Sequence, residues 1–292
     1  MPKFNKPVLA FSAMTAEIAP EGFAKLREIG VPVLPSPARV ARAMGMLADY
    51  AEALARGAGQ PLPAPDIVLP ALPPGPMTLD ENESKGVLAA AGIPVTRDKL
   101  LALGSTSLDG ELKFPFAVKI VSREILHKTD IGGVRLHVSN AEQLAAAVTE
   151  VTANARRAMP DAQLSGVLVS EMVPDGVESI VGIVNDAGFG PVVAFGIGGV
   201  YAEAVRDMSY RIAPFGLDEA RAMIGELRMR ALFDGMRGRP ACDVEALANI
   251  LVRVSELAWQ MRDRLAELDI NPLIVRPQGA GVVAADALIV LR

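Results

Sequence analysis

The residues whose setting first indicates chemistry lie in one apolar run and in the loop that follows it. Lys119 stands between Val118 and Ile120, in a run that is typical of a buried strand. Because a buried ammonium group is costly unless it meets an anion, this lysine predicts an anion-binding site. A phosphate group is the most obvious anion.

The loop after this strand carries His127, one of two histidines in the chain. Lys128 and Asp130 follow it, and the pair Gly132-Gly133 ends the loop. Glycines let backbone N–H groups come close to an oxyanion, and an imidazole among charges can titrate near neutral pH or act as a nucleophile. These residues alone leave open the alternative of a solvated loop histidine.

A third group of polar side chains interrupts the two apolar runs within residues 267–291. If residues 277–280 form the loop of a hairpin, Asn271 falls directly opposite Asp286, and Asp269 projects to the same face. Magnesium that is bound with a nucleotide uses one or two hard oxygens from the protein, which an Asn–Asp pair supplies. The alternative is an ordinary hairpin with a solvated polar face.

A glycine-rich turn follows the expected strands at residues 178–185 and 191–195. Gly198 and Gly199 form this turn, and Glu203 comes shortly after them. A glycine turn serves many purposes, so this motif is a weak signal without its context.

Composition and charge exclude several classes of protein. A chain of 292 residues is long enough for about two domains. The net charge of −5 and the lack of a basic run argue against a general nucleic-acid-binding surface. The single cysteine excludes an intramolecular disulfide, and the first residues lack a signal-like apolar core. Gly, Pro and charges interrupt every apolar run, so we expect no membrane span and a cytoplasmic protein.

The elements that carry these residues divide into two domains. Residues 7–54 predict two short strands and two helices in β-α-β-α order, so we expect residues 1–56 to form part of a doubly wound, flavodoxin-like domain. Residues 57–77 are rich in proline and predict an extended linker. Residues 78–292 form the second domain, with helices expected at 218–233 and 243–265, among others.

These stretches together resemble the ATP-grasp domain of NDP-forming acyl-CoA synthetases, relatives of succinyl-CoA synthetase and of the ADP-forming acetate–CoA ligases. The features that carry the resemblance are Lys119 on its strand, the His127 loop, the glycine turn, and residues 267–273 with Asp286. It covers residues 77–292. Residues 7–54 similarly resemble the closing part of the CoA-ligase-like domain that precedes the ATP-grasp domain in single-chain members.

The resemblance implies an α/β fold of two α+β lobes that clasp a nucleotide, ATP or ADP. It implies that His127 carries the phosphoryl group and that Asp269 orients its ring. It implies a Mg²⁺ site at Asn271 and Asp286. The residues that the resemblance places at the nucleotide are Lys119, Glu171, Val173, Glu178, Gly198, Gly199 and Glu203.

The resemblance also implies the reaction acid + CoA + ATP ⇌ acyl-CoA + ADP + phosphate. The family's CoA-binding parts are absent from this sequence, so we expect a CoA-binding alpha-type subunit or missing N-terminal domains to complete the site. We also expect an oligomer, and neither nucleic acid nor a membrane as a partner. Two rivals are a binding-only ATP-grasp module, such as those attached to protein acetyltransferases, and a carboxylate–amine ligase, which needs no histidine carrier.

Overall fold

The computed structural model describes residues 6–56, 67–108, 110, 112–199, 207–235, 238 and 240–292. Contacts within the chain divide it into two compact units, Met1–Pro61 and Leu62–Arg292.

The first unit has the predicted β-α-β-α order: β1 (Ala10–Phe11), α1 (Pro20–Glu28), β2 (Val33–Leu34) and α2 (Pro37–Arg56). The two strands pair in parallel, as a strand–helix–strand crossover requires. Both helices begin at a proline, whose fixed φ suits the first helical position. The predicted β-α-β-α order is therefore confirmed, and its assignment to a flavodoxin-like domain stays a prediction.

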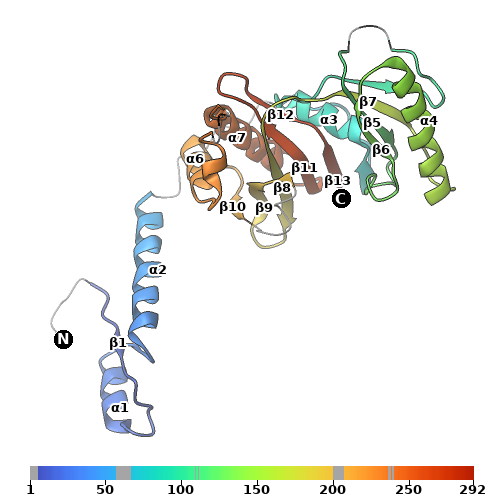
Figure 1. Ribbon diagram of the computed structural model, residues 1–292. Helices are drawn as coiled ribbons and strands as arrows, with labels where there is room; N and C mark the ends of the chain where they lie inside the picture. The colour runs from blue at the N-terminus through green and yellow to red at the C-terminus, as the bar shows by residue number, and fades with distance from the viewer. Residues whose placement is uncertain are drawn as a thin grey trace. The chain divides into compact units, whose positions relative to one another are not determined.

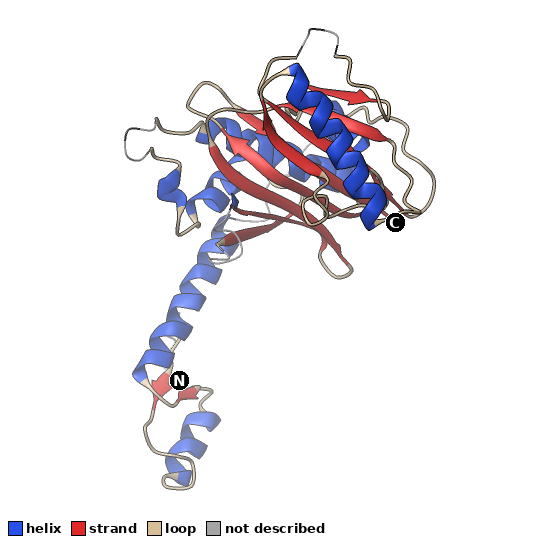
Figure 2. Ribbon diagram, turned by 45° about the vertical axis from the view of Figure 1, so that its right-hand side comes forward, coloured by secondary structure: helices blue, strands red, loops and turns tan. Residues whose placement is uncertain are grey.

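The second unit contains a smaller sheet that positions Lys119. Four antiparallel strands lie in the order β4 (Asp98–Leu101), β7 (Gly166–Glu171), β5 (Phe116–Val121) and β6 (Val134–Val138). Helix α4 (Ala141–Ala158) lies across this sheet, as Figure 2 shows. All six residues of β5 are buried, which explains its continuous apolar run around one lysine.

A larger, seven-stranded sheet makes the rest of this unit, with strand order β10-β9-β8-β11-β13-β3 and with β12 paired to β11 (Figure 1). Its strands are β3 (Met77–Leu79), β8 (Val177–Asp186), β9 (Gly190–Ile197), β10 (Met208–Ile212), β11 (Leu265–Val275), β12 (Val282–Ala284) and β13 (Ala287–Leu291).

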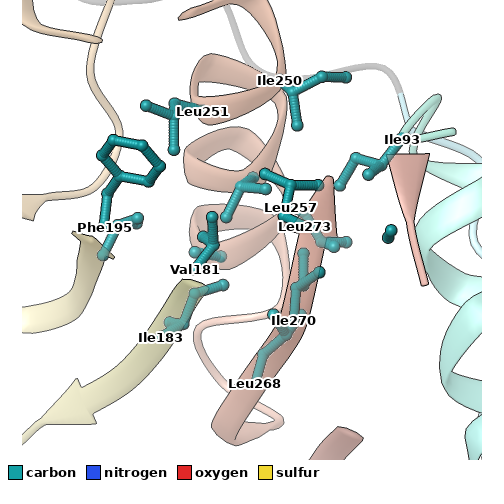
Figure 3. Close-up of a cluster of buried hydrophobic side chains, with 14 of the residues drawn as sticks. Ile93, Val181, Ile183, Phe195, Ile250, Leu251, Leu257, Leu268, Ile270 and Leu273 are labelled. Carbon is teal, nitrogen blue, oxygen red and sulfur yellow. The ribbon is translucent and has the colours of Figure 1, made fainter. Parts of the chain in front are cut away.

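Helices α6 (Leu217–Gly225) and α7 (Val244–Gln260) pack against the larger sheet, α6 next to β10 and α7 next to β9, β11 and β12. Helix α3 (Glu81–Ala90) lies against β13. In Figure 3, side chains of α7 such as Leu251 and Leu257 meet side chains of β8, β9 and β11. These side chains are fully buried, and each stabilises the fold by about 1.5–3 kcal/mol. No described helix has both the length and the hydropathy to span a bilayer.

The prediction of a single helix over residues 218–233 is wrong. Helix α6 ends at Gly225, and a separate 3₁₀ turn, η2, covers Arg230–Leu232. The buried carboxylate of Asp207 accepts hydrogen bonds from the backbone N–H groups of Arg228 (3.1 Å) and Met229 (2.8 Å). Those donors are therefore not available to the helical ladder, and the helix stops before them.

The second half of the predicted linker lies against the second unit. Ile67 is buried, and its carbonyl accepts a hydrogen bond of 2.6 Å from the side chain of Gln260. The carbonyl of Pro73 accepts one of 2.6 Å from Arg264. Strand β3 then begins at Met77, the last residue of the predicted linker.

Candidate active site

The C-terminal hairpin has the predicted register. Arg276 N–H donates to the carbonyl of Gly281 at 3.0 Å, and Leu273 pairs with Ala284. Asn271 N–H donates to the carbonyl of Asp286 at 3.3 Å. Asn271 and Asp286 therefore stand opposite each other across the hairpin, as the sequence predicts.

A residue that sequence reasoning missed holds the loop of this hairpin. Asp243, the N-cap of α7, accepts hydrogen bonds through Oδ2 from Gly279 N–H (2.9 Å) and Gly281 N–H (3.2 Å), and through Oδ1 from Ala246 N–H (3.1 Å). One carboxylate thus caps a helix and fixes the loop. This contact ties the register of the hairpin to the position of α7.

The side chain of Lys119 extends from the smaller sheet to this hairpin. Its buried Nζ lies 3.0 Å from Oδ2 of Asp286 and 3.0 Å from the carbonyl oxygen of Ala285. It also donates to Oε1 of Glu81 at 2.7 Å. Burial opposes the charged form, but the two carboxylates outweigh it and raise the pKa of Lys119 above its ordinary value. The lysine therefore remains an ammonium group.

Glu81 is the centre of this arrangement. Its side chain is completely buried at the first position of α3. It forms ion pairs with Lys119, with Lys85 at 3.1 Å and with Lys128 at close range. Burial would raise the pKa of Glu81, but the three ammonium groups hold it well below its ordinary value. A capping box between Asp80 and Glu83 fixes this end of the helix.

Lys85 extends the network toward β4, because its Nζ also lies 2.8 Å from Oδ2 of Asp98 and 2.9 Å from Oγ1 of Thr96. Three lysines and three carboxylates therefore share one region between the two sheets. We call them the lysine–carboxylate cluster: Lys85, Lys119, Lys128, Glu81, Asp98 and Asp286.

Sequence reasoning missed Glu81. The available signal was a Glu and a Lys four residues apart at the start of a capped helix. Such pairs are usually solvated, so only burial distinguishes this one.

Asp269 lies on the same side of β11 as this cluster. Burial first, and then the charges of Glu267 and Asp286, raise the pKa of Asp269 to about 6. Among the described residues, no group of three or more His, Cys, Asp or Glu side chains could hold a metal ion. The Mg²⁺ site at Asn271 and Asp286 therefore stays a prediction, which depends on two opposed hard oxygens.

The raised pKa of Asp269 predicts a change in stability. At pH 7.5 the ionised carboxylate destabilises the fold, so Asp269→Asn should increase the free energy of unfolding by about 1–2 kcal/mol, after allowance for partial exposure. Because the folded pKa lies above the unfolded one, the penalty is fully present above about pH 6 and disappears as the pH falls toward 4.

Urea unfolding in EDTA at pH 7.5 and pH 4.5 measures this difference. Asp263→Asn, which removes an exposed carboxylate, is the matched control and should change little at either pH. An equal effect of Asp269→Asn at both pH values would contradict the prediction.

His127 is exposed in the loop between β5 and β6. It lines a surface hollow of about 310 Å³ together with Glu124, Asp130 and Met159, among others. Within the described residues, no hydrogen bond or ion pair joins His127 to Asp269. The next residue, Lys128, is the one whose side chain turns inward to the cluster. The structure thus brings together Lys119, Asn271 and Asp286, but it does not bring His127 to Asp269.

Glu171 is the last residue of β7, and its carboxylate has hydrogen-bond and ion-pair partners within the protein. Its Oε1 accepts from Lys113 N–H at 2.7 Å and lies 3.2 Å from the guanidinium of Arg97. Val173 follows β7 and is half-buried. The carboxylate of Glu171 therefore has protein partners through Oε1 in this structure.

Glu178 and the glycine turn do come together. Gly198 N–H donates to the carbonyl of Glu178 at 2.8 Å. Gly199 has φ +68°, and a Cβ there would lie 3.0 Å from Oε2 of Glu178, so a larger residue would crowd this carboxylate. Glu203 lies outside the described residues.

The comparisons with known proteins show the family. A family model of the ATP-grasp domain matches residues 71–291. The chain belongs to this ATP-grasp family. One relative is the beta subunit of acetate–CoA ligase (ADP-forming) II from Pyrococcus furiosus, which is 37% identical over 228 residues, covering 77% of this chain and 97% of the relative.

Within the ATP-grasp family, the chain is also similar to a longer protein and to solved structures. Acetate–CoA ligase (ADP-forming) I of Archaeoglobus fulgidus is 35% identical over 280 residues, which is 92% of this chain and 40% of the relative. An acetyl-coenzyme A synthetase 1 of Ca. Korarchaeum cryptofilum matches with a TM-score of 0.64 and 36% identity, over 74% of this chain and 93% of that one. That structure holds coenzyme A and Mg-AMPPCP, with its phosphohistidine segment pointing towards the nucleotide-binding site.

Proposed function

We propose that this chain is the nucleotide-binding and phosphoryl-transfer part of an NDP-forming acyl-CoA synthetase. The observation that carries the proposal is the contact of 3.0 Å between Lys119 of the smaller sheet and Asp286 of the larger one, with Asn271 opposite Asp286. This contact places an ammonium group and hard oxygens at one point between two sheets. A nucleoside triphosphate with its metal needs both.

Lys119 binds the α- and β-phosphates in this proposal. Its partners in the structure are Glu81 and Asp286, so phosphate oxygens replace a carboxylate when the nucleotide enters. Glu178 and the turn at Gly198 and Gly199 lie beside the adenosine, as do Glu171 and Val173 at the end of β7. Because the side chain of Glu171 is engaged by Arg97, this end of β7 offers backbone groups to the base.

Asn271 and Asp286 hold Mg²⁺ with the nucleotide. Two opposed hard oxygens fit this ion, which takes its remaining ligands from phosphates and water. When bound, the ion neutralises charge on the transferring phosphoryl group. The complex of the Ca. Korarchaeum cryptofilum synthetase with Mg-AMPPCP supports a magnesium–nucleotide ligand.

His127 is the residue that accepts the phosphoryl group. Its ring is exposed and free of hydrogen bonds to other described residues, so a ring nitrogen is available as a nucleophile. Asp269 orients the ring when the side chain of His127 turns toward the nucleotide site. The phosphohistidine segment of the Ca. Korarchaeum cryptofilum synthetase points towards its nucleotide site, which supports a loop that can present His127 in this way.

A second chain or further domains complete the reaction. The Pyrococcus furiosus relative is called a beta subunit, and this chain covers 40% of the longer Archaeoglobus fulgidus relative. A CoA-binding alpha-type subunit, or domains fused ahead of this segment, therefore supplies the thioester step in our proposal. The whole assembly converts an acid, CoA and ATP into acyl-CoA, ADP and phosphate.

Incubation of the full chain with ATP labelled at the γ-phosphate and with Mg²⁺ tests this proposal. Covalent label that is lost in acid and survives base is the expected result, because phosphohistidine has this lability. A binding-only module would bind the nucleotide and take up no label. Absence of label on a protein that binds ADP would therefore overturn the proposal.

The metal part of the site makes a separate prediction. Asp286→Asn should weaken the binding of Mg·ADP by at least about tenfold, or ~1.4 kcal/mol, because it removes the charged one of two hard oxygens. Isothermal titration calorimetry with and without Mg²⁺ measures this change. Lys119 keeps Glu81 and the carbonyl of Ala285, so the variant should fold. Asp161→Asn, at an exposed site, is the control, and unchanged affinity in Asp286→Asn would contradict the prediction.

A further inference from the structure

Lys128, the residue directly after His127, is bound to the interior of the protein. Its Nζ makes a close ion pair with Oε2 of Glu81 and lies 3.6 Å from Oδ1 of Asp286. The side chain of Lys128 is 11% exposed and that of Glu81 is 0% exposed, so the pair is shielded from water. This is the lysine of the cluster that comes from a loop and not from a strand or helix.

The His127 segment is also tied to the protein on both sides of residues 126–130: Asn154 of α4 donates to the carbonyl of Gly132 at 3.0 Å, and Ile125 is buried. Leu126, His127, Thr129 and Asp130 are exposed, and within residues 126–130 it is Lys128 whose side chain makes an ion pair. Hydrogen bonds from Gly132 to Thr129 (3.1 Å) and from Gly133 to Lys128 (2.7 Å) shape the turn, but they lie inside the loop. They do not join His127 to another element.

We infer that the ion pair of Lys128 and Glu81 is a latch that holds the His127 loop against the nucleotide site. The inference rests on the proposed function, in which His127 must meet a phosphate bound at Lys119. A buried ion pair holds one geometry far better than an exposed pair does, because water cannot replace either partner. Lys128 is a positioning residue in this scheme, since it acts through His127.

The cluster also explains why the latch can be removed without loss of the fold. Without Lys128, Glu81 still pairs with the ammonium groups of Lys119 at 2.7 Å and Lys85 at 3.1 Å. The buried carboxylate therefore keeps two ammonium partners. Lys128→Met keeps most of the length of the side chain and removes the charge, and Lys128→Arg restores the charge.

Hydrogen–deuterium exchange of the full chain without nucleotide tests the latch directly. In Lys128→Met, amides of residues 122–133 should exchange at least about tenfold faster than in the wild type, and in Lys128→Arg within about twofold. Arg123→Met is the matched control, because Arg123 joins the same loop to the same helix through Glu83 but with both side chains partly exposed, at 42% and 31%. It should change exchange much less than Lys128→Met does. Unchanged exchange in Lys128→Met would overturn the latch.

Labelling and binding separate the latch from a direct phosphate contact. The initial rate of labelling by γ-labelled ATP should fall about tenfold in Lys128→Met and recover in Lys128→Arg, while the Kd for ADP stays within about twofold. An increase in the Kd for ADP as large as that of Lys119→Met would make Lys128 a phosphate ligand and overturn the latch. If the wild type takes up no label at all, the proposed function fails, and the exchange experiment still decides whether Lys128 restrains the loop.

Discussion

Replacing His127 by alanine should reduce labelling by γ-labelled ATP to the background of the assay, with nucleotide affinity almost unchanged. In the proposed step a ring nitrogen of His127 attacks the γ-phosphorus and forms an N–P bond. The bond to the bridging oxygen breaks, and ADP leaves with its electron pair. The other ring nitrogen keeps its proton, and the carboxylate of Asp269 stabilises the cationic ring.

The chain offers a matched control for this experiment. His137, the other histidine, is exposed on β6 of the same sheet, so His137→Ala removes an imidazole from a comparable setting. His137→Ala should label at the wild-type rate. If the label survives in His127→Ala and disappears in His137→Ala, then His137 is the phosphocarrier and our assignment of that role to His127 is wrong. His127→Ala should unfold at the same urea concentration as the wild type, because the side chain is exposed.

Replacing Glu81 by glutamine should destabilise the protein by about 3–5 kcal/mol, the largest effect on stability that we expect from a single change. Glu81 is the carboxylate that three lysines share, and its loss leaves their charges opposed by Asp98 and Asp286 only. Removing one partner of a buried ion pair leaves uncompensated charge in a region with little water. Urea unfolding at pH 7 measures the difference.

The control for Glu81 stands two residues away on the same helix. Glu83→Gln removes a partly exposed charge that pairs with Arg123, and glutamine can keep the capping box, so the cost should be below about 1 kcal/mol. A cost for Glu81→Gln as small as this would contradict the central role of the carboxylate. Because the folded pKa of Glu81 is lowered, its contribution is present above its ordinary pKa of 4.5 and is lost as the pH falls further.

Much of the site could be predicted because it depends on the spacing of residues that are close together in the chain. The opposition of Asn271 and Asp286 follows from a loop of four residues and the period of a strand, and the register of the hairpin confirms it. Lys119 could be recognised as a candidate anion-binding residue, because a charged side chain inside an apolar run is costly unless it has an anionic partner. The helix at 218–233 failed for the opposite reason, since Asp207, more than ten residues earlier, takes the N–H groups that the helix needs.

Glu81 and Lys128 show where sequence reasoning ended. Nothing local separates Glu81 from Glu83, yet one side chain is fully buried and the other is partly exposed. Their difference arises because β5, the His127 loop and the C-terminal hairpin converge on the first turn of α3 from distant parts of the chain. The same convergence turns Lys128 inward and leaves His127 outside, a choice that the order of residues in the loop does not reveal.

The amino-acid order was thus sufficient to predict the ATP-grasp family, a buried lysine that needs anionic partners, and the opposed positions of Asn271 and Asp286 in the hairpin. Each of these predictions depends on residues that are close together in the chain. The fold alone settled which charges are buried together, since desolvation and ion pairing depend on side chains brought from five different segments. For the same reason the fold, and not the motif, shows His127 apart from Asp269 and Lys128 bound to Glu81.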